Sequence, residues 1–109
     1  MAVLNVQVFA LAPETAKPLT PEQQYQVFTS FTDGLSGLLG HAGPVFVMSR
    51  DVTPYDTGAL VQVLCLADSG DTVTDTVAEH LSAAMAGDPA FFESWELAAG
   101  EIYVASSDN

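Results

Sequence analysis

Residues 45–67 read VFVMSRDVTPYDTGALVQVLCLA, and this stretch decides the fold. Two apolar runs rich in β-branched residues, 45–52 and 59–67, stand on either side of a turn-forming segment, 53–58. A short polar connection between two such runs is typical of a β-hairpin. The stretch therefore predicts two neighbouring antiparallel strands.

The strand expected over residues 59–67 is apolar on both faces. One face carries Val61, Val63, Cys65 and Ala67, and the other carries Leu60, Leu64 and Leu66, interrupted only by Gln62. The strand over 45–52 repeats the pattern, with Val45 and Val47 on one face and Phe46, Met48 and Val52 on the other. Antiparallel sheets with one face in water normally alternate apolar with polar residues. Something apolar must therefore cover the second face.

We expect this cover to be a second copy of the chain. Two-fold dimers are the commonest oligomers, and they place the same surface of each copy against the other. The dimer face then consists of Phe46, Met48, Leu60, Leu64 and Leu66. Two other covers stay open: a lid formed by residues 13–19 or 91–97, or a ligand bound in a pocket on that face.

The chain before the hairpin predicts a strand, a loop and the start of a helix. Residues 3–12 alternate with period two, which is typical of a strand, and the two prolines within 13–19 indicate a loop. Thr20, Pro21 and Gln23 then supply the N-cap, the first helical position and the N3 position of a capping box. A helix therefore begins at Pro21.

This first helix carries one apolar stripe that can lie on a sheet. The residues of the stripe recur at spacings of three and four and are Tyr25, Phe28, Phe31, Leu35, Leu38 and Leu39. We expect the helix to end at Gly40, followed by Gly43 and Pro44. Gly34 and Gly37 weaken its last turns by about 1 kcal/mol each, which indicates close packing or a fraying end.

The remaining chain predicts a second helix and a closing strand. The apolar positions of the helix, which begins at Thr72 and ends at Gly87, are Val73, Val77, Leu81, Ala84 and Met85. Asp88 and Pro89 start one extra turn through Phe91 and Phe92, residues 101–106 form the strand, and residues 107–109 form a flexible tail.

The resulting order of elements is β-α-β-β-α-β. Right-handed crossovers in this order place both helices on one face of a four-stranded antiparallel sheet. We therefore expect residues 1–109 to form a single α+β domain with a ferredoxin-like fold, paired into a homodimer through the uncovered sheet.

The charge of the chain excludes two classes of partner. Lys17 and Arg50 are the only basic residues against 14 Asp and Glu, and the formal net charge is −12. Nucleic acids and anionic membranes attract clusters of Lys and Arg, which cannot exist here. A charged partner would instead be basic. No apolar segment reaches the length of a membrane span, and the single Cys65 allows no internal disulfide, so we expect a cytoplasmic protein.

No motif predicts a catalytic residue, a metal site or a cofactor. Lys17 lies in a proline-flanked loop and not in a phosphate-binding P-loop. Cys65, in the middle of a strand, is expected to be an inert buried thiol. His80 has no second ligand four residues away, as a helical metal pair would require. His41 is expected to cap the C-terminus of the first helix, where the dipole favours a cation.

The charge pattern of the second helix is the strongest functional signal. Asp71, Asp75 and Glu79 fall at i, i+4 and i+8 and form one acidic ridge on the side away from Val77 and Leu81. Like charges at this spacing are mildly destabilising, by about 0.2–0.5 kcal/mol per pair. The ridge is therefore a candidate surface for binding a basic partner, although it is also compatible with a simple solvated face.

Three functions compete. The first is a non-catalytic, dimeric acidic interaction protein that binds a basic surface of another protein, as phage or bacterial accessory proteins and inhibitors do. The second is a small-molecule enzyme or binder, because the element order resembles that of small dimeric α/β barrels of the antibiotic-biosynthesis monooxygenase type. That resemblance implies a small-molecule enzyme or binder, with a pocket bordered by Phe28, His80, Trp95 and Tyr103. The third is a structural subunit of a larger assembly.

Overall fold

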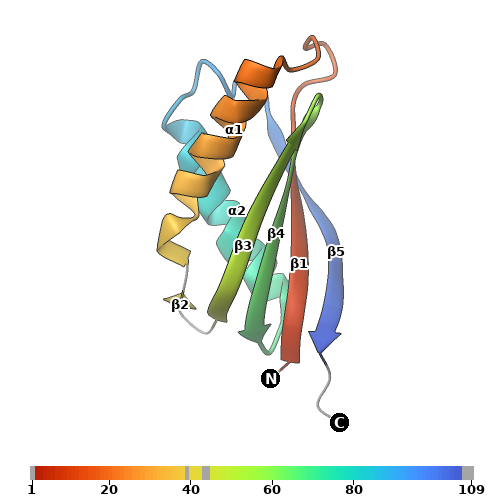
Figure 1. Cartoon of the computed structure of the whole chain (residues 1–109), viewed down its shortest axis with the longest axis vertical. Helices are drawn as coiled ribbons and strands as arrows, with labels where there is room; N and C mark the ends of the chain where they lie inside the picture. The colour runs from red at the N-terminus through yellow and green to blue at the C-terminus, as the bar shows by residue number, and fades with distance from the viewer. Residues whose placement is uncertain (1, 39, 43–44, 107–109) are drawn as a thin grey trace.

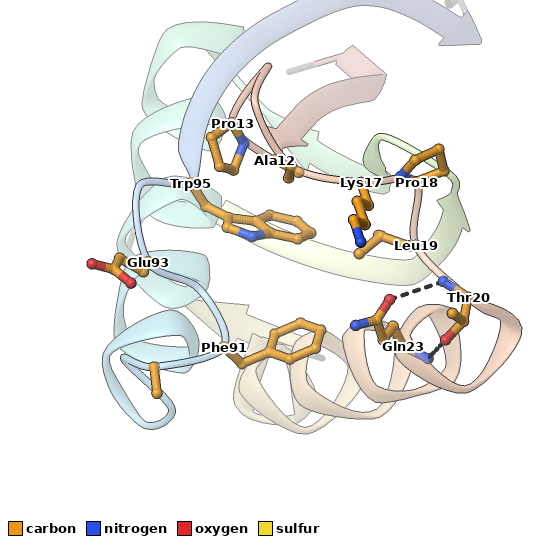
Figure 2. A pocket seen from close by; sticks show the side chains of 12 residues that line it. Ala12, Pro13, Lys17, Pro18, Leu19, Thr20, Gln23, Phe91, Glu93 and Trp95 are labelled. Atoms are coloured by element: carbon orange, nitrogen blue, oxygen red, sulfur yellow. Dashed lines mark hydrogen bonds between the residues drawn. The ribbon is translucent and has the colours of Figure 1, made fainter.

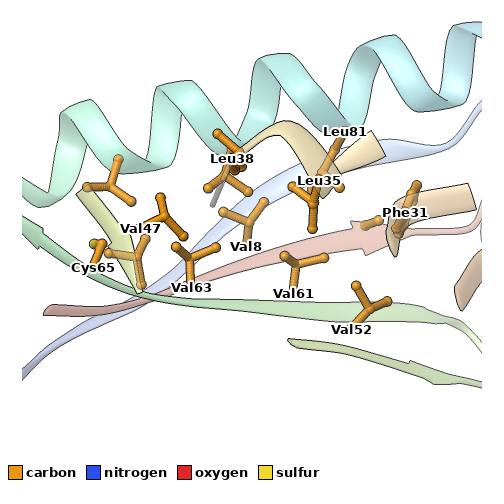
Figure 3. Close-up of a cluster of buried hydrophobic side chains, with 14 of the residues drawn as sticks. Val8, Phe31, Leu35, Leu38, Val47, Val52, Val61, Val63, Cys65 and Leu81 are labelled. Atoms are coloured by element: carbon orange, nitrogen blue, oxygen red, sulfur yellow. The ribbon is translucent and has the colours of Figure 1, made fainter. Parts of the chain in front are cut away.

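The computed structural model describes residues 2–38, 40–42 and 45–106 of the chain (Figure 1). Along the chain its elements are β1 (Ala2–Leu11), α1 (Pro21–Gly34), the 3-10 turn η1 (Ser36–Leu38), β2 (Gly40–Ala42), β3 (Val45–Tyr55), β4 (Gly58–Ala67), α2 (Gly70–Ala86) and β5 (Glu96–Ser106). The strands form one antiparallel sheet in the order β2-β3-β4-β1-β5. Both helices pack on one face of this sheet, with the core between the two layers (Figure 3).

The predicted α+β architecture, in which two helices pack on four long antiparallel strands, is confirmed. The predicted order of elements is not matched in full, because η1 and the short strand β2 stand between α1 and β3. α1 ends at Gly34, so the predicted end at Gly40 is wrong. Glycine is a poor helix former, and Gly40–Ala42 instead pairs with β3, which satisfies its backbone groups in a ladder. The predictions for Leu39, Gly43, Pro44 and residues 107–109 fall outside the described residues.

α1 begins at a capping box, as the sequence predicts. The Gln23 backbone N–H donates to Thr20 Oγ1 at 3.2 Å, and the Thr20 backbone N–H donates to Gln23 Oε1 at 2.9 Å. These reciprocal bonds satisfy two backbone donors that have no partner within the helix. They also tie the loop over residues 12–20 to the first turn of α1.

The buried side of α1 differs from the predicted stripe. Val27, Phe31 and Leu35 face the sheet and are fully buried. Tyr25 and Phe28 are 68% and 39% exposed, so their assignment to the buried stripe is wrong. These three buried residues are spaced four apart and form one row along the helix. The rings of Tyr25 and Phe28 lie outside this row and stack on each other, with centroids 6.5 Å apart.

The core is formed by aliphatic side chains from both layers. In Figure 3, Leu35, Leu38 and Leu81 descend from the helical layer towards Val8 and Val61 of the sheet. The largest side chains that are almost completely buried are Phe31, Leu35, Leu38, Leu81, Val6, Val8, Val27, Val45, Val61, Val63, Val73 and Val77. Burial of one such side chain contributes about 1.5–3 kcal/mol relative to exposure, so this cluster dominates the stability of the fold.

A β-bulge in β3 overturns one prediction. The register with β4 shifts between Val47 and Ser49, so Met48 is an extra residue in the strand. An extra residue inverts the alternation of faces beyond it. Val52 consequently pairs with Val61 and is only 6% exposed, so its assignment to the open side of the sheet is wrong.

Other boundaries move for the same tertiary reasons. β5 begins at Glu96, five positions before the predicted start at Glu101, because Leu97 and Ala98 pair with β1 although their own sequence does not alternate. The hairpin connection shrinks to two residues, since β3 continues to Tyr55 and β4 begins at Gly58. The extra turn after α2 is present: the Phe92 backbone N–H donates to the carbonyl oxygen of Asp88 at 3.1 Å.

Gly34 marks a close contact between the helices, and we expect Gly34→Leu to destabilise the protein by about 1–3 kcal/mol. A Cβ atom at Gly34 would lie 2.7 Å from Ala84 Cβ of α2, closer than such atoms approach. Gly37→Leu is the matched control, because a Cβ there meets nothing within 4 Å. Urea unfolding of both variants measures the difference, and equal stabilities would contradict the close contact.

Candidate functional site

The face of the sheet opposite the helices, here called the open face, is apolar towards both ends. At one end Leu66 of β4 stands opposite Val3 of β1 and Phe46 of β3, and at the other Leu60 stands opposite Phe9. Phe46 is 37% exposed and the others are half-buried. Of the predicted dimer-face residues Phe46, Met48, Leu60, Leu64 and Leu66, none is fully buried.

The middle of the open face is polar. Gln62 of β4 lies opposite Gln7 of β1, and its Oε1 accepts hydrogen bonds from Asn5 Nδ2 and Gln7 Nε2, each at 3.4 Å. These distances are long for such bonds, so the three amide groups keep hydrogen-bonding capacity for a further partner. Gln62 is therefore the centre of an amide cluster and not an isolated interruption of an apolar strand.

Arg50 is the one Lys or Arg among the described residues of the sheet, and it stands opposite the buried Val63 of β4, on the side that the helices cover. It helps to line a cavity of about 260 Å³ together with Asn5, Ser49, Asp51, Gln62 and Leu64. Its Nε atom is buried and has no hydrogen-bond partner among the described residues. A buried donor without a partner costs about 1–3 kcal/mol, so the buried Nε of Arg50 lowers the stability of the fold.

The acidic ridge lies on the outer surface of α2. Asp71, Asp75 and Glu79 are exposed, whereas Val73 and Val77 of the same helix are buried against the sheet. Asp71 stands in the first turn, where the helix dipole favours a carboxylate. Neither α1 nor α2 contains a Lys or Arg, so no cation within the helical layer neutralises the ridge.

The four residues expected to border one pocket are distributed over different surfaces. Tyr103 of β5 is 46% exposed and lies on the open face, and Phe28 lies on the outside of α1. His80 of α2 is half-buried, and its Nδ1 donates to the carbonyl oxygen of Thr76 at 2.9 Å. Trp95 lines a cavity to which the other three do not contribute.

Within the described residues there is no group of three or more His, Cys, Asp or Glu that could hold a metal ion. Burial raises the pKa of the Cys65 thiol, which lowers its thiolate fraction. A side-chain hydrogen bond with Glu101 raises the pKa of Tyr103. His41 lies in β2, so its predicted role at the end of the first helix is wrong, because α1 stops before reaching it.

A larger cavity, here called the end cavity, lies where β1 ends and β5 begins (Figure 2). Its volume is about 610 Å³. Residues from the loop over 12–20, the first turn of α1 and the segment before β5 line it, among them Pro13, Lys17, Gln23, Phe91, Glu93 and Trp95. Sequence reasoning missed this site; the available signal was a lone Lys in an acidic chain and three aromatic residues within 91–95.

An aromatic cluster holds one wall of the end cavity in place. The ring of Trp95 contacts Phe92 edge-on at 5.1 Å between centroids and lies 6.2 Å from Phe91. Its backbone N–H donates to the carbonyl oxygen of Phe92 at 3.1 Å. The preceding residue, Ser94, has a left-handed backbone with φ of 63°, a conformation that costs a non-glycine residue about 1–3 kcal/mol. Trp95 is therefore fixed by its surroundings.

None of the described helices is both long and apolar enough to cross a membrane.

Comparison with known proteins identifies no family. No protein-family model matches the chain, and no curated protein matches it. One solved structure, the aminobenzoyl-glutamate utilization protein from Klebsiella pneumoniae, is similar at 20% sequence identity with a TM-score of 0.37. The match covers 99% of this chain and 29% of that one. At this TM-score the similarity supports no conclusion about fold or function, so the function must be argued from the surfaces themselves.

Proposed function

We propose that this protein is a non-catalytic interaction protein that forms a homodimer through the open face and binds a basic surface of a partner protein with its acidic ridge. It would act as a cytoplasmic accessory or inhibitor protein. We further propose that the sheet is a variant of the ferredoxin-like arrangement, extended at one edge by β2.

The observation that carries this proposal is the exposure of the acidic ridge without a neutralising cation. Asp71, Asp75 and Glu79 are exposed on one side of α2, and neither helix contains a basic residue. Uncompensated carboxylates repel one another unless they bind cations, and a partner with Lys or Arg at matching spacing would remove this repulsion. The Debye length is about 10 Å in 0.1 M salt, which is longer than the spacing between neighbouring carboxylates of the ridge. An approaching protein therefore experiences their combined electrostatic potential.

The composition of the open face supports the homodimer. Two apolar ends with a central amide cluster can pair with themselves across a two-fold axis, since Asn5, Gln7 and Gln62 both donate and accept hydrogen bonds. A dimer of this kind would place the two sheets against each other. Each α2 would then face outward, so self-association leaves the acidic ridge free for the partner.

We expect reversal of the ridge, D71K/D75K/E79K, to weaken binding of an oligolysine peptide at low salt by at least about tenfold, or about 1.4 kcal/mol. The reason is that attraction between the ridge and a cation becomes repulsion. Isothermal titration calorimetry with the full chain measures the affinity, and circular dichroism confirms that the variant is folded.

The matched control is E14K/E22K/D33K, which changes the net charge equally at three exposed acidic positions outside α2. We expect this control to retain most of the affinity. If both triple variants lose affinity to the same extent, binding depends on net charge alone and the ridge is not a docking surface.

A further inference from the structure

The end cavity has the volume of a small-molecule site and is separate from both surfaces used above. Its volume of about 610 Å³ falls within the range of ligand pockets, roughly 300–1,000 Å³. The acidic ridge lies on α2, and the open face lies on the side of the sheet away from the helices. No residue of either surface lines this cavity. Whatever binds here can therefore be tested independently of the proposed function.

One side of the end cavity is aromatic. Figure 2 shows the rings of Phe91 and Trp95 projecting into it from the segment before β5. Packing against Phe92 fixes the indole, so its face is presented without further ordering. Rigid aromatic faces favour a flat apolar group, because ring stacking adds to the stabilisation from burying apolar area.

The opposite side of the end cavity offers hydrogen-bond donors. The capping box occupies Gln23 Oε1 at 2.9 Å from the Thr20 backbone nitrogen, so the group that Gln23 turns towards the cavity is its Nε2 donor. Lys17 extends into the same space in Figure 2. Two donors, one of them charged, suit a carboxylate.

The nearby acidic residues do not occupy this donor pair. Glu93 borders the cavity, but its carboxylate points away from the interior in Figure 2. Glu14 and Asp56 line an adjoining cavity of about 250 Å³, which Lys17 also borders. Among the described residues no carboxylate forms a salt bridge with Lys17, so its charge is available to a ligand.

We infer that the end cavity binds a small organic carboxylate with a flat aromatic body. The ring packs against Trp95 and Phe91, and the carboxylate accepts hydrogen bonds from Lys17 Nζ and Gln23 Nε2. A chain with a net charge of −12 repels anions elsewhere, so the cation and the aromatic pair together define where such a ligand binds.

The test uses 3-phenylpropionate and its uncharged counterpart, 3-phenylpropan-1-ol, with Trp95 as the reporter. Trp95 is the only tryptophan of the chain, so its fluorescence reports on this cavity alone. We expect a saturable change with the acid and an affinity for the alcohol at least about tenfold lower, because the alcohol carries no charge for Lys17. Equal affinities for the two compounds, or no saturable change at millimolar acid, would overturn the inference.

Three variants locate the binding. Lys17→Met should weaken binding of the acid by at least about tenfold, whereas Arg50→Met, which removes the same charge from the sheet, should change it by less than about twofold. Gln23→Glu keeps an oxygen for the capping box but replaces the Nε2 donor with a carboxylate, so it should weaken binding while α1 stays intact. Unchanged affinity in both Lys17→Met and Gln23→Glu would refute the site.

Discussion

Replacing Phe31 with Ala is expected to lower the free energy of unfolding by about 3–5 kcal/mol. Phe31 is completely buried and its ring stacks on Phe92, with centroids 5.4 Å apart, at the point where α1, the sheet and the segment before β5 meet. Truncation removes its apolar contacts and leaves a cavity that the closely packed neighbours cannot fill. Urea denaturation followed by circular dichroism measures the change.

Phe28→Ala provides the matched control on the same helix. Phe28 is 39% exposed and stacks only on Tyr25 at the surface, so its truncation should cost about 1 kcal/mol or less. The sequence places both residues on one apolar stripe, and only the packing separates them. Similar losses of stability in the two variants would mean that α1 is rotated relative to the sheet described here.

The double variant L64D/L66D is expected to convert a dimer into a monomer. If the open face is the dimer interface, each Leu→Asp change removes the burial of one apolar side chain, which contributes about 1.5 kcal/mol or more to association. The two changes together should therefore weaken association by at least about 100-fold. Both side chains point away from the core, so the monomer should remain folded. Sedimentation velocity at a concentration where the wild type is dimeric measures the shift.

The control for this experiment adds the same two charges elsewhere. In Y25D/V104D the replaced side chains are exposed apolar groups, one on α1 and one on β5 at a position paired with the buried Leu4. This variant should keep the oligomeric state of the wild type. A wild-type protein that sediments as a monomer at all accessible concentrations would rule out the homodimer through the open face.

The elements that sequence reasoning predicted best are those set by local chemistry. The capping box at Thr20 and Gln23 defines the start of α1 because both of its hydrogen bonds span only three residues. The alternation in β1 and β4 assigned their faces correctly, since a strand without a bulge has an invariant period of two.

The predictions that failed depended on partners distant in sequence. Val52 changed faces because Met48 is an extra residue in the pairing of β3 with β4, and a bulge of this kind leaves no periodic trace in a single strand. Similarly, β5 extends back to Glu96 because β1 offers it a partner. The end of α1 moved because Gly40–Ala42 found a partner in β3.

The same difference between local and distant contacts separates the two candidate sites. Asp71, Asp75 and Glu79 could be placed on one exposed row from their spacing alone, because a helix repeats every 3.6 residues. Lys17, Gln23 and Trp95 could not be brought together in this way, since they belong to three segments that meet only at one end of the folded sheet.

By itself, the sequence determined the α+β class, the faces of its regular strands, the start of α1, the acidic ridge and the scarcity of cations. Only the tertiary structure decided which aromatic side chains are buried, where β3 bulges and which residues line the end cavity. The physical reason is the range of the interactions. Periodicity and capping act over a few residues, whereas strand register and cavity walls arise from contacts between segments that the chain order does not place together.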